Sequence, residues 1–190
     1  ANAAPSTVPD AVFEKLLADI VGGTHLRGAR LPPERELVRD LGASRASVRD
    51  ALRRLEEWRL ISIRHGSGAV VRPRTEWTFE ALPASLRNAK TIEGSGASDL
   101  IRDALELRRV TVTGMVQLAA ARIAPGALAT ARATVAEAWR ARANLEEFAA
   151  LDLQVMHDVL DAAEMLPAMW LLNKVAPVYV ESIRAIGVNA

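Results

Sequence analysis

The chain has 190 residues, half of them hydrophobic and only 4% aromatic, so it is not disordered and favours an aliphatic, helical core within one or two domains. It contains no cysteine, which excludes a disulfide scaffold, a thiolate zinc site and a cysteine nucleophile, and no run of about 18 apolar residues that would span a membrane. The net charge of +1 hides an asymmetry, because residues 25–74 contain twelve arginines and six acidic residues whereas both flanking segments are acidic. Such a basic block indicates a module that meets a polyanion.

The sequence of the N-terminal third predicts short helices. Residues 1–9 lack the features of a signal peptide, and we expect them to form a mobile tail. The first helix is predicted to start after Pro9, with Asp10 as its cap, because apolar residues then recur at helical spacing. A second helix is predicted over residues 34–41, with Pro33 just before it.

A tight turn at residues 41–44 leads into a third predicted helix, capped by Ser44. Its apolar residues recur at i, i+3, i+4 and i+7, at Val48, Ala51, Leu52 and Leu55. Its other face carries Arg45, Ser47, Arg49 and Arg53. In residues 60–71, apolar residues flank a glycine-rich centre on both sides, which predicts a short hairpin.

Three helices and a hairpin predict a winged helix-turn-helix (α/β) domain over residues 10–73. The exposed start of its third helix offers hydroxyls, guanidinium groups and the positive end of the helix dipole, which suit the major groove of DNA. The small basic hairpin tip, residues 64–68, suits the minor groove.

Three segments of this domain resemble the GntR family of bacterial transcription factors. They are the runs Leu31–Leu37 and Gly42–Leu55 and the hairpin Ile63–Gly68. The resemblance implies that bases or nearby phosphates are contacted by Arg35, Arg45 and Arg49, phosphates by Ser44 and Ser47, and the minor groove by His65 and Gly66. Ala46 stands where members of the FadR branch often carry a hydroxyl, which implies a different operator sequence.

The rest of the chain reads as a linker and a helical domain. Residues 74–97 are predicted to be a linker with one short packed helix, in which Trp77 and Phe79 dock onto a domain. From residue 98 to 190 the pattern is helical throughout, in four segments, so we predict a C-terminal all-α helical bundle. Pro177 lies inside the last segment and is expected to bend it or shift its start.

This second half resembles the effector-sensing and dimerisation (FCD) domain of the FadR branch. The runs Leu105–Arg109 and Leu151–Leu160 carry the resemblance. Such domains have six or seven helices, whereas four or five fit before Ala190. The bundle is therefore expected to be shorter than usual for the family, either truncated or a short natural variant.

Many members of that branch hold a metal with one Asp and three His. Only His157 lies in this half of the chain, and Asp152, five residues earlier, is about 140° away around a helix. We therefore predict no metal, with Asp152 and His157 as the weak alternative.

The members of that branch that bind fatty acyl-CoA lack the metal and keep the helices, so the resemblance implies an effector of that class near Arg108, His157 and Tyr179. Each residue also has a structural interpretation. Tyr179 can be a core residue, Arg108 an internal ion pair and His157 a surface or structural histidine.

The sequence thus predicts a homodimeric regulator in the bacterial cytoplasm that binds a palindromic operator, senses an acyl ligand and needs no cofactor. One alternative is a regulator of the same family that senses a small carboxylate metabolite, with or without metal. A metal-dependent or acid–base enzyme would need a catalytic constellation that the sequence does not present. An architectural DNA protein would bind without sequence preference.

Overall fold

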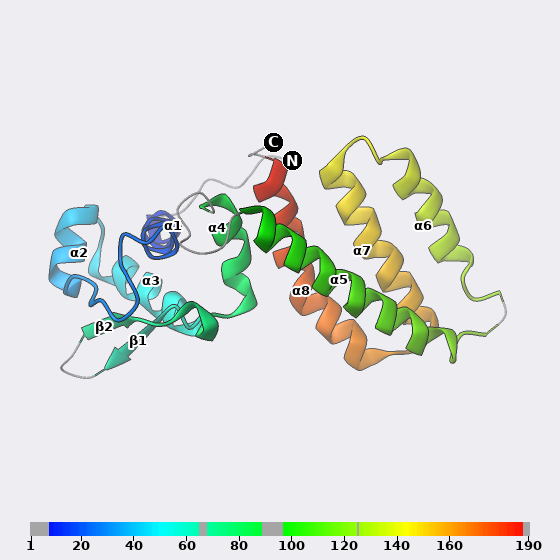
Figure 1. Ribbon diagram of the computed structural model, residues 1–190, viewed down its shortest axis with the longest axis horizontal. Coiled ribbons are helices and arrows are strands. Elements are labelled where there is room, and N and C mark those ends of the chain that lie inside the picture. The colour runs from blue at the N-terminus through cyan, green and yellow to red at the C-terminus, as the bar shows by residue number, and fades with distance from the viewer. Residues whose placement is uncertain (1–7, 65–67, 89–96, 125, 188–190) are drawn as a thin grey trace. The chain divides into compact units, whose positions relative to one another are not determined.

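The structure, a computed structural model, describes residues 8–64, 68–88, 97–124 and 126–187 (Figure 1). It divides into two compact units, residues 1–94 and 95–190. The first unit combines helices with a two-stranded wing and the second is helical, as the sequence predicts. No helix among the described residues is long and apolar enough to cross a membrane.

The N-terminal unit begins with three helices and a hairpin. In chain order these are α1 (Val8–Val21), α2 (Glu34–Leu41), α3 (Arg45–Glu57), β1 (Ile61–Arg64) and β2 (Gly68–Val71). The predicted tail of residues 1–9 is two residues too long, because α1 starts at Val8. A proline in the first helical turn lacks only an N–H that would have no partner there, so Pro9 does not prevent this start. Residues 1–7 lie outside the described part of the chain.

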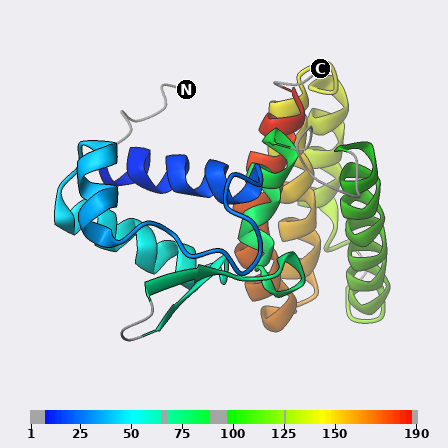
Figure 2. The ribbon, with the colours of Figure 1, turned by 60° about the vertical axis from the view of Figure 1, so that its left-hand side comes forward.

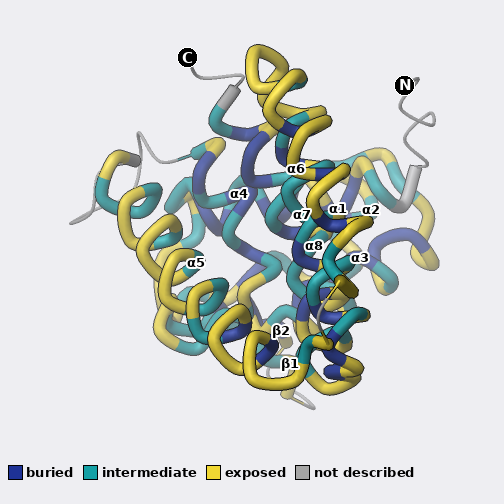
Figure 3. The backbone as a smooth tube through the Cα atoms, turned by 90° about the vertical axis from the view of Figure 1, so that its right-hand side faces the viewer, coloured by how far each residue is buried: buried dark blue, intermediate teal, exposed yellow. Residues whose placement is uncertain are grey.

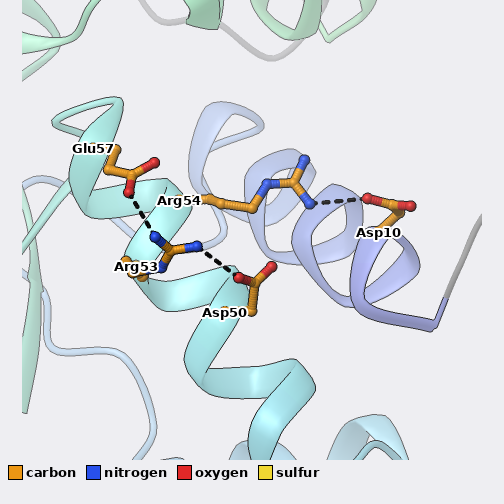
Figure 4. A network of polar contacts seen from close by, with 5 residues as sticks. All are labelled: Asp10, Asp50, Arg53, Arg54 and Glu57. Carbon is orange, nitrogen blue, oxygen red and sulfur yellow. Dashed lines mark hydrogen bonds and ion pairs between the residues drawn. The ribbon is translucent and has the colours of Figure 1, made fainter.

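Helices α1 and α3 pack together around the predicted apolar stripes. Every residue of the α3 stripe is buried, and so are the α1 residues Phe13, Leu16, Leu17, Ile20 and Val21. The rings of Phe13 and Trp58 pack nearly perpendicular to each other, at a centroid distance of 4.9 Å. The guanidinium of Arg54 covers the same Phe13 ring at 3.8 Å, and it donates to Asp10 on α1 at 2.9 Å (Figure 4).

Residues 74–88, predicted as part of a linker, fold onto the N-terminal unit. They form two 3-10 turns, η1 (Arg74–Glu76) and η2 (Phe79–Ala81), and the short helix α4 (Leu82–Arg87). Ala81 and Ala84 join the core of this unit, and Trp77 packs against it and donates its indole N–H to the Arg72 carbonyl at 3.2 Å. Phe79 is exposed. Residues 89–96 lie outside the described part of the chain.

The C-terminal unit consists of four helices in its described part: α5 (Ala97–Ala120), α6 (Ala129–Arg140), α7 (Leu145–Ala162) and α8 (Leu166–Gly187). Helix α7 packs against the other three (Figure 2). Helix α8 runs through Pro177, so this proline does not shift the helix start. The core is small and rich in methionine. It consists of Met115, Ala119, Met156, Leu160, Ala163, Met165 and Leu172.

Many apolar side chains of this second unit lie outside its core. The exposed ones include Leu105, Leu107, Val110, Val116 and Leu118 on α5, Val135 and Trp139 on α6, and Trp170 on α8. The helical spacing of the sequence predicts the helices here, but it does not tell which of two apolar faces packs inward.

Candidate nucleic-acid interface

The turn between α2 and α3 is set by Gly42. This residue has φ +60°, a left-handed conformation that favours glycine, and it ends α2. The N–H of Ala43 donates to the carbonyl of Val38 at 3.2 Å, so the turn satisfies an otherwise unpaired carbonyl of the helix end. The chain then reverses into α3 within two residues.

Ser44 caps α3 as predicted. Its backbone is extended, and its hydroxyl accepts a hydrogen bond from the N–H of Ser47 at 3.0 Å. The two hydroxyls lie 2.9 Å apart and share a second hydrogen bond. Ser44 is exposed whereas Ser47 is buried, so Ser47 supports the cap from behind, and Ser44 is the hydroxyl that solvent reaches.

The predicted base-contacting arginines are exposed on α2 and the first turns of α3. Arg45 and Arg49 are exposed on α3, Arg35 is exposed on α2, and Ala46 is also exposed. Arg49 is held in one direction, because its Nε donates to the carboxylate of Glu34 at 2.7 Å. Glu34 is fifteen residues away in the sequence, so no motif or helical spacing indicates this partner.

Two further arginines of α3 form ion pairs within the chain. Arg53 pairs with Asp50 at 3.0 Å and with Glu57 at 3.2 Å, and Arg54 pairs with Asp10 (Figure 4). The hydrogen bond to Asp50 and the charge of Glu57 raise the pKa of Arg53. The other two arginines of α3, Arg45 and Arg49, lie in its first two turns.

The wing is an antiparallel hairpin in which Ile61 pairs with Val71 and Arg64 with Gly68. Ile61 and Val71 are buried, and Arg64 is exposed at the end of β1. The predicted minor-groove residues His65 and Gly66 lie outside the described residues.

In the C-terminal unit, two of the three predicted effector residues meet. Arg108 of α5 forms an ion pair with Asp152 of α7, and its guanidinium lies 5.1 Å from the ring centre of Tyr179 on α8. The Tyr179 hydroxyl donates to the same Asp152 carboxylate at 3.5 Å. These three residues, called the Arg108 cluster below, are partly buried.

Burial and charge shift the titrations of this cluster. Burial alone would lower the pKa of Arg108, but the hydrogen bond and charge of Asp152 raise it overall. Burial raises the pKa of Tyr179, Arg108 opposes this, and Asp152 adds to it, so the net shift is upward. Arg108 is thus a charged residue that is held by a carboxylate. The sequence allowed either an effector contact or an internal ion pair for this residue, and the contact with Asp152 matches the ion pair.

His157 is not part of the Arg108 cluster. It is exposed on α7, while Asp152 is turned toward Arg108 and Tyr179. The described residues contain no group of three or more His, Asp or Glu side chains placed to hold a metal ion.

The sequence and the fold are similar to known regulators. Residues 9–71 match the family described as bacterial regulatory proteins, gntR family. The chain is 36% identical over 120 residues to the HTH-type transcriptional regulator Rv0494 of Mycobacterium tuberculosis, covering 63% of this chain and 44% of that protein. It is also 36% identical over 70 residues to the galactonate operon transcriptional repressor of Escherichia coli, covering 37% of this chain and 31% of the repressor.

One solved structure shares the fold across most of the chain. It is that of Lar, which controls the expression of the Listeria monocytogenes agr system, with a TM-score of 0.55 and 19% identity over 95% of this chain and 74% of that one. The chain spans less than half the length of the relative Rv0494 that it matches. The turn, the capped helix and the wing coincide with the matched segment. Residues 9–71 therefore form a winged helix-turn-helix domain whose sequence matches the gntR family of bacterial regulatory proteins.

Proposed function

We propose that the protein is a transcriptional regulator that binds a palindromic DNA operator as a homodimer. The observation that carries the proposal is the capped start of α3, where Arg45, Arg49 and Ser44 are exposed on a domain of the gntR family. Guanidinium forks at the start of such a helix suit guanine edges and phosphates in the major groove. A two-fold copy doubles the few base pairs that one helix can read.

The test is a binding titration with the duplex upstream of the protein's own gene, at fixed salt, against random duplex as competitor. We expect Arg45→Ala and Arg49→Ala each to cost about 1–3 kcal/mol of operator binding and much less on random DNA. Arg87→Ala is the control, because it removes the same charge from α4 of the same unit, where Arg87 pairs with Glu14. Equal losses on both duplexes would contradict direct reading of bases.

We further propose that the C-terminal unit senses an anionic acyl ligand of the fatty acyl-CoA class. Two features support this proposal. A groove of about 430 Å³ has an apolar part, Leu153, Ala176, Pro177 and Val180, which suits an acyl chain, and a polar part, Asn173, Glu181 and Arg184. Arg108 is a partly buried cation that forms an ion pair with the carboxylate of Asp152. An anionic ligand would take the place of this carboxylate as the partner of Arg108.

Long-chain acyl-CoA is expected to change operator affinity several-fold, whereas free CoA is not. Arg108→Ala should abolish the response while leaving operator binding intact. Arg109→Ala is the matched control, since it removes the neighbouring arginine, which is exposed and lies 3.8 Å from Glu106. A response to small carboxylates and not to acyl-CoA would favour the alternative regulator of carboxylate metabolites.

A further inference from the structure

Helix α3 and the wing are joined by a tight turn. Arg59 in this turn has φ +59°, a left-handed conformation that is uncommon for residues other than glycine. The N–H of Arg59 donates to the carbonyl of Glu56 at 2.9 Å. The N–H of Leu60 donates to the carbonyl of Leu55, also at 2.9 Å. These two hydrogen bonds close the end of α3 in the Schellman motif, so the backbone sets the direction in which the chain leaves the helix.

Strand β1 has one edge paired with β2 and one open edge. Ile63 lies opposite Ala69 in the hairpin, and the carbonyl of Ala69 accepts from the N–H of Leu31 at 2.9 Å. The main-chain groups of Ala69 therefore point away from β1, and those of the residue opposite it point outward as well. The N–H of Ile63 thus faces the open edge. Along the strand, burial falls from Ile61, which is buried, to Ile63 and Arg64, which are exposed (Figure 3).

Glu56 covers this open edge. Its carboxylate, in the last turn of α3, accepts a hydrogen bond from the N–H of Ile63 at 2.8 Å. Glu56 is exposed and Ile63 is 46% exposed, so water would satisfy the same N–H, and the fold does not require the bond. Glu56 thus holds the junction twice: its main-chain carbonyl binds the turn, and its side chain binds the strand that follows.

We propose that Glu56 is a positioning residue that fixes the wing relative to α3, so that Arg64 contacts DNA at the same time as Arg45 and Arg49. The inference rests on the proposed DNA-binding function. Arg64 directly follows Ile63 and is exposed at the end of β1, so a shift of Ile63 moves it. A wing that already has its bound geometry avoids an ordering cost on binding. A carboxylate does not itself attract phosphates, so Glu56 acts through the wing.

The geometry is measured first in the free protein. Because the chain has no cysteine, spin labels at Ala46→Cys on α3 and Arg64→Cys on the wing report one distance between two exposed positions. We expect Glu56→Ala to broaden the distribution of this distance about twofold and to speed amide exchange of Ile63 about tenfold, since it removes the acceptor. Glu56→Gln keeps an acceptor oxygen and should restore both values.

Glu57→Ala is the matched control for this measurement. It removes the neighbouring carboxylate of α3, which pairs with Arg53 at 3.2 Å and not with the wing. The distance and the amide exchange should then stay at their wild-type values. An unchanged distance distribution in Glu56→Ala would overturn the proposal, and it would leave Glu56 as a charge that only protects a strand edge from pairing with another chain.

Operator binding tests the consequence for DNA. Glu56→Ala should weaken operator binding about tenfold, although it removes a negative charge, whereas random duplex should bind at least as tightly as before. Arg64→Ala should cost several-fold less affinity in the Glu56→Ala background than in the wild type, because the wing is already released. Arg45→Ala should cost the same in both backgrounds. Fully additive losses for Glu56→Ala and Arg64→Ala would contradict an action through the wing.

The two measurements separate this inference from the proposed function. A wing that is released in Glu56→Ala without any loss of operator affinity would overturn the role of Glu56 in binding and leave the proposed function standing. A wild-type chain that does not prefer its operator would refute sequence-specific regulation. The spin-label distances in the free protein would then still decide whether Glu56 fixes the wing.

Discussion

At the scale of single residues, Ser44 combines a structural role with a predicted contact to DNA. Its hydroxyl caps α3 and is exposed at the proposed phosphate side. Ser44→Ala should cost about 1 kcal/mol of stability, which lowers the melting temperature of a domain of this size by about 4–8 °C. Ser44→Asp keeps the cap but adds a negative charge facing phosphate. It should therefore keep the melting temperature and lose most operator affinity, and strong operator binding by this variant in an anisotropy titration would contradict the contact.

The pair between Glu34 and Arg49 predicts a separable effect on specificity. Both side chains are accessible, at 34% and 72%, so the pair contributes little to stability, within about 0.5 kcal/mol. Glu34→Gln removes a negative charge beside the DNA and frees the arginine. We expect random duplex to bind more tightly and the ratio of operator to random affinity to fall. A ratio that stays at the wild-type value would show that Glu34 does not orient Arg49 in the complex.

These residues show what a sequence reveals about a site. Ser44, Arg45 and Arg49 were predictable because local rules place them: a cap precedes a helix, and the face opposite an apolar stripe is exposed. Glu34 as the partner of Arg49, and Asp152 as the partner of Arg108, were not predictable in this way. Their separations of 15 and 44 residues depend on how helices pack, which no local spacing encodes.

At the scale of elements, two glycines should respond to alanine with opposite signs. A Cβ added at Gly42 or at Gly114 would meet no atom within 4 Å, so neither substitution causes a clash and the two differ only in backbone conformation. Gly42 has φ +60° at the end of α2, where alanine costs about 1–2 kcal/mol. Gly114 lies inside α5, where alanine gains about 1 kcal/mol. Urea unfolding should therefore show Gly42→Ala less stable and Gly114→Ala more stable than wild type, and Gly42→Asn should lose less than Gly42→Ala.

The elements also show where periodicity is informative. Helices α1 to α3 each have one apolar stripe, and the structure buries it. Helix α5 has apolar residues on several sides, so its spacing predicts a helix but not the direction in which it packs. The short segment 74–88 reads as a linker because of its prolines and polar residues, yet small side chains such as Ala81 and Ala84 fit against the domain before it.

Helices α5, α7 and α8 meet at the Arg108 cluster. This cluster predicts that the stability of the C-terminal unit depends on pH in the alkaline range. Burial and Asp152 together raise the pKa of Tyr179 above 10.0, despite the opposing charge of Arg108. Below pH 10 the tyrosine is neutral in both states and the stability of the C-terminal unit is fully present. Above it the unfolded chain ionises first, so stability is lost as the pH rises through the folded pKa.

The chain has a single tyrosine, so the absorbance of tyrosinate reports on this cluster alone. We expect its titration midpoint to lie above 10 in the native protein and to return to the ordinary value in denaturant. Asp152→Asn should lower the native midpoint, because it removes both the negative charge and a carboxylate acceptor. Arg109→Ala should leave it unchanged. A native midpoint equal to the denatured one would mean that Tyr179 is neither buried nor held by Asp152.

At the scale of the whole molecule, the two compact units have separate cores and carry separate optical probes. Trp58 and Trp77 pack against the core of the first unit, and Tyr179 lies in the second. Trp139 and Trp170 are largely exposed, so their fluorescence should change less on unfolding. Tryptophan fluorescence therefore follows mainly the N-terminal unit, whereas tyrosine absorbance follows the C-terminal one.

Ligands should move these two transitions differently. A duplex at 100 times its dissociation constant adds about 2.7 kcal/mol to the free energy of unfolding of the unit that it binds. Operator DNA should therefore raise the midpoint temperature of the transition followed by tryptophan fluorescence by several degrees. Long-chain acyl-CoA should raise the tyrosine transition instead. If the acyl ligand alters DNA affinity, linkage requires the same coupling free energy in reverse, and each ligand must then also change the response to the other. Transitions that coincide with and without each ligand would show that the two units unfold as one cooperative body, which would contradict this prediction.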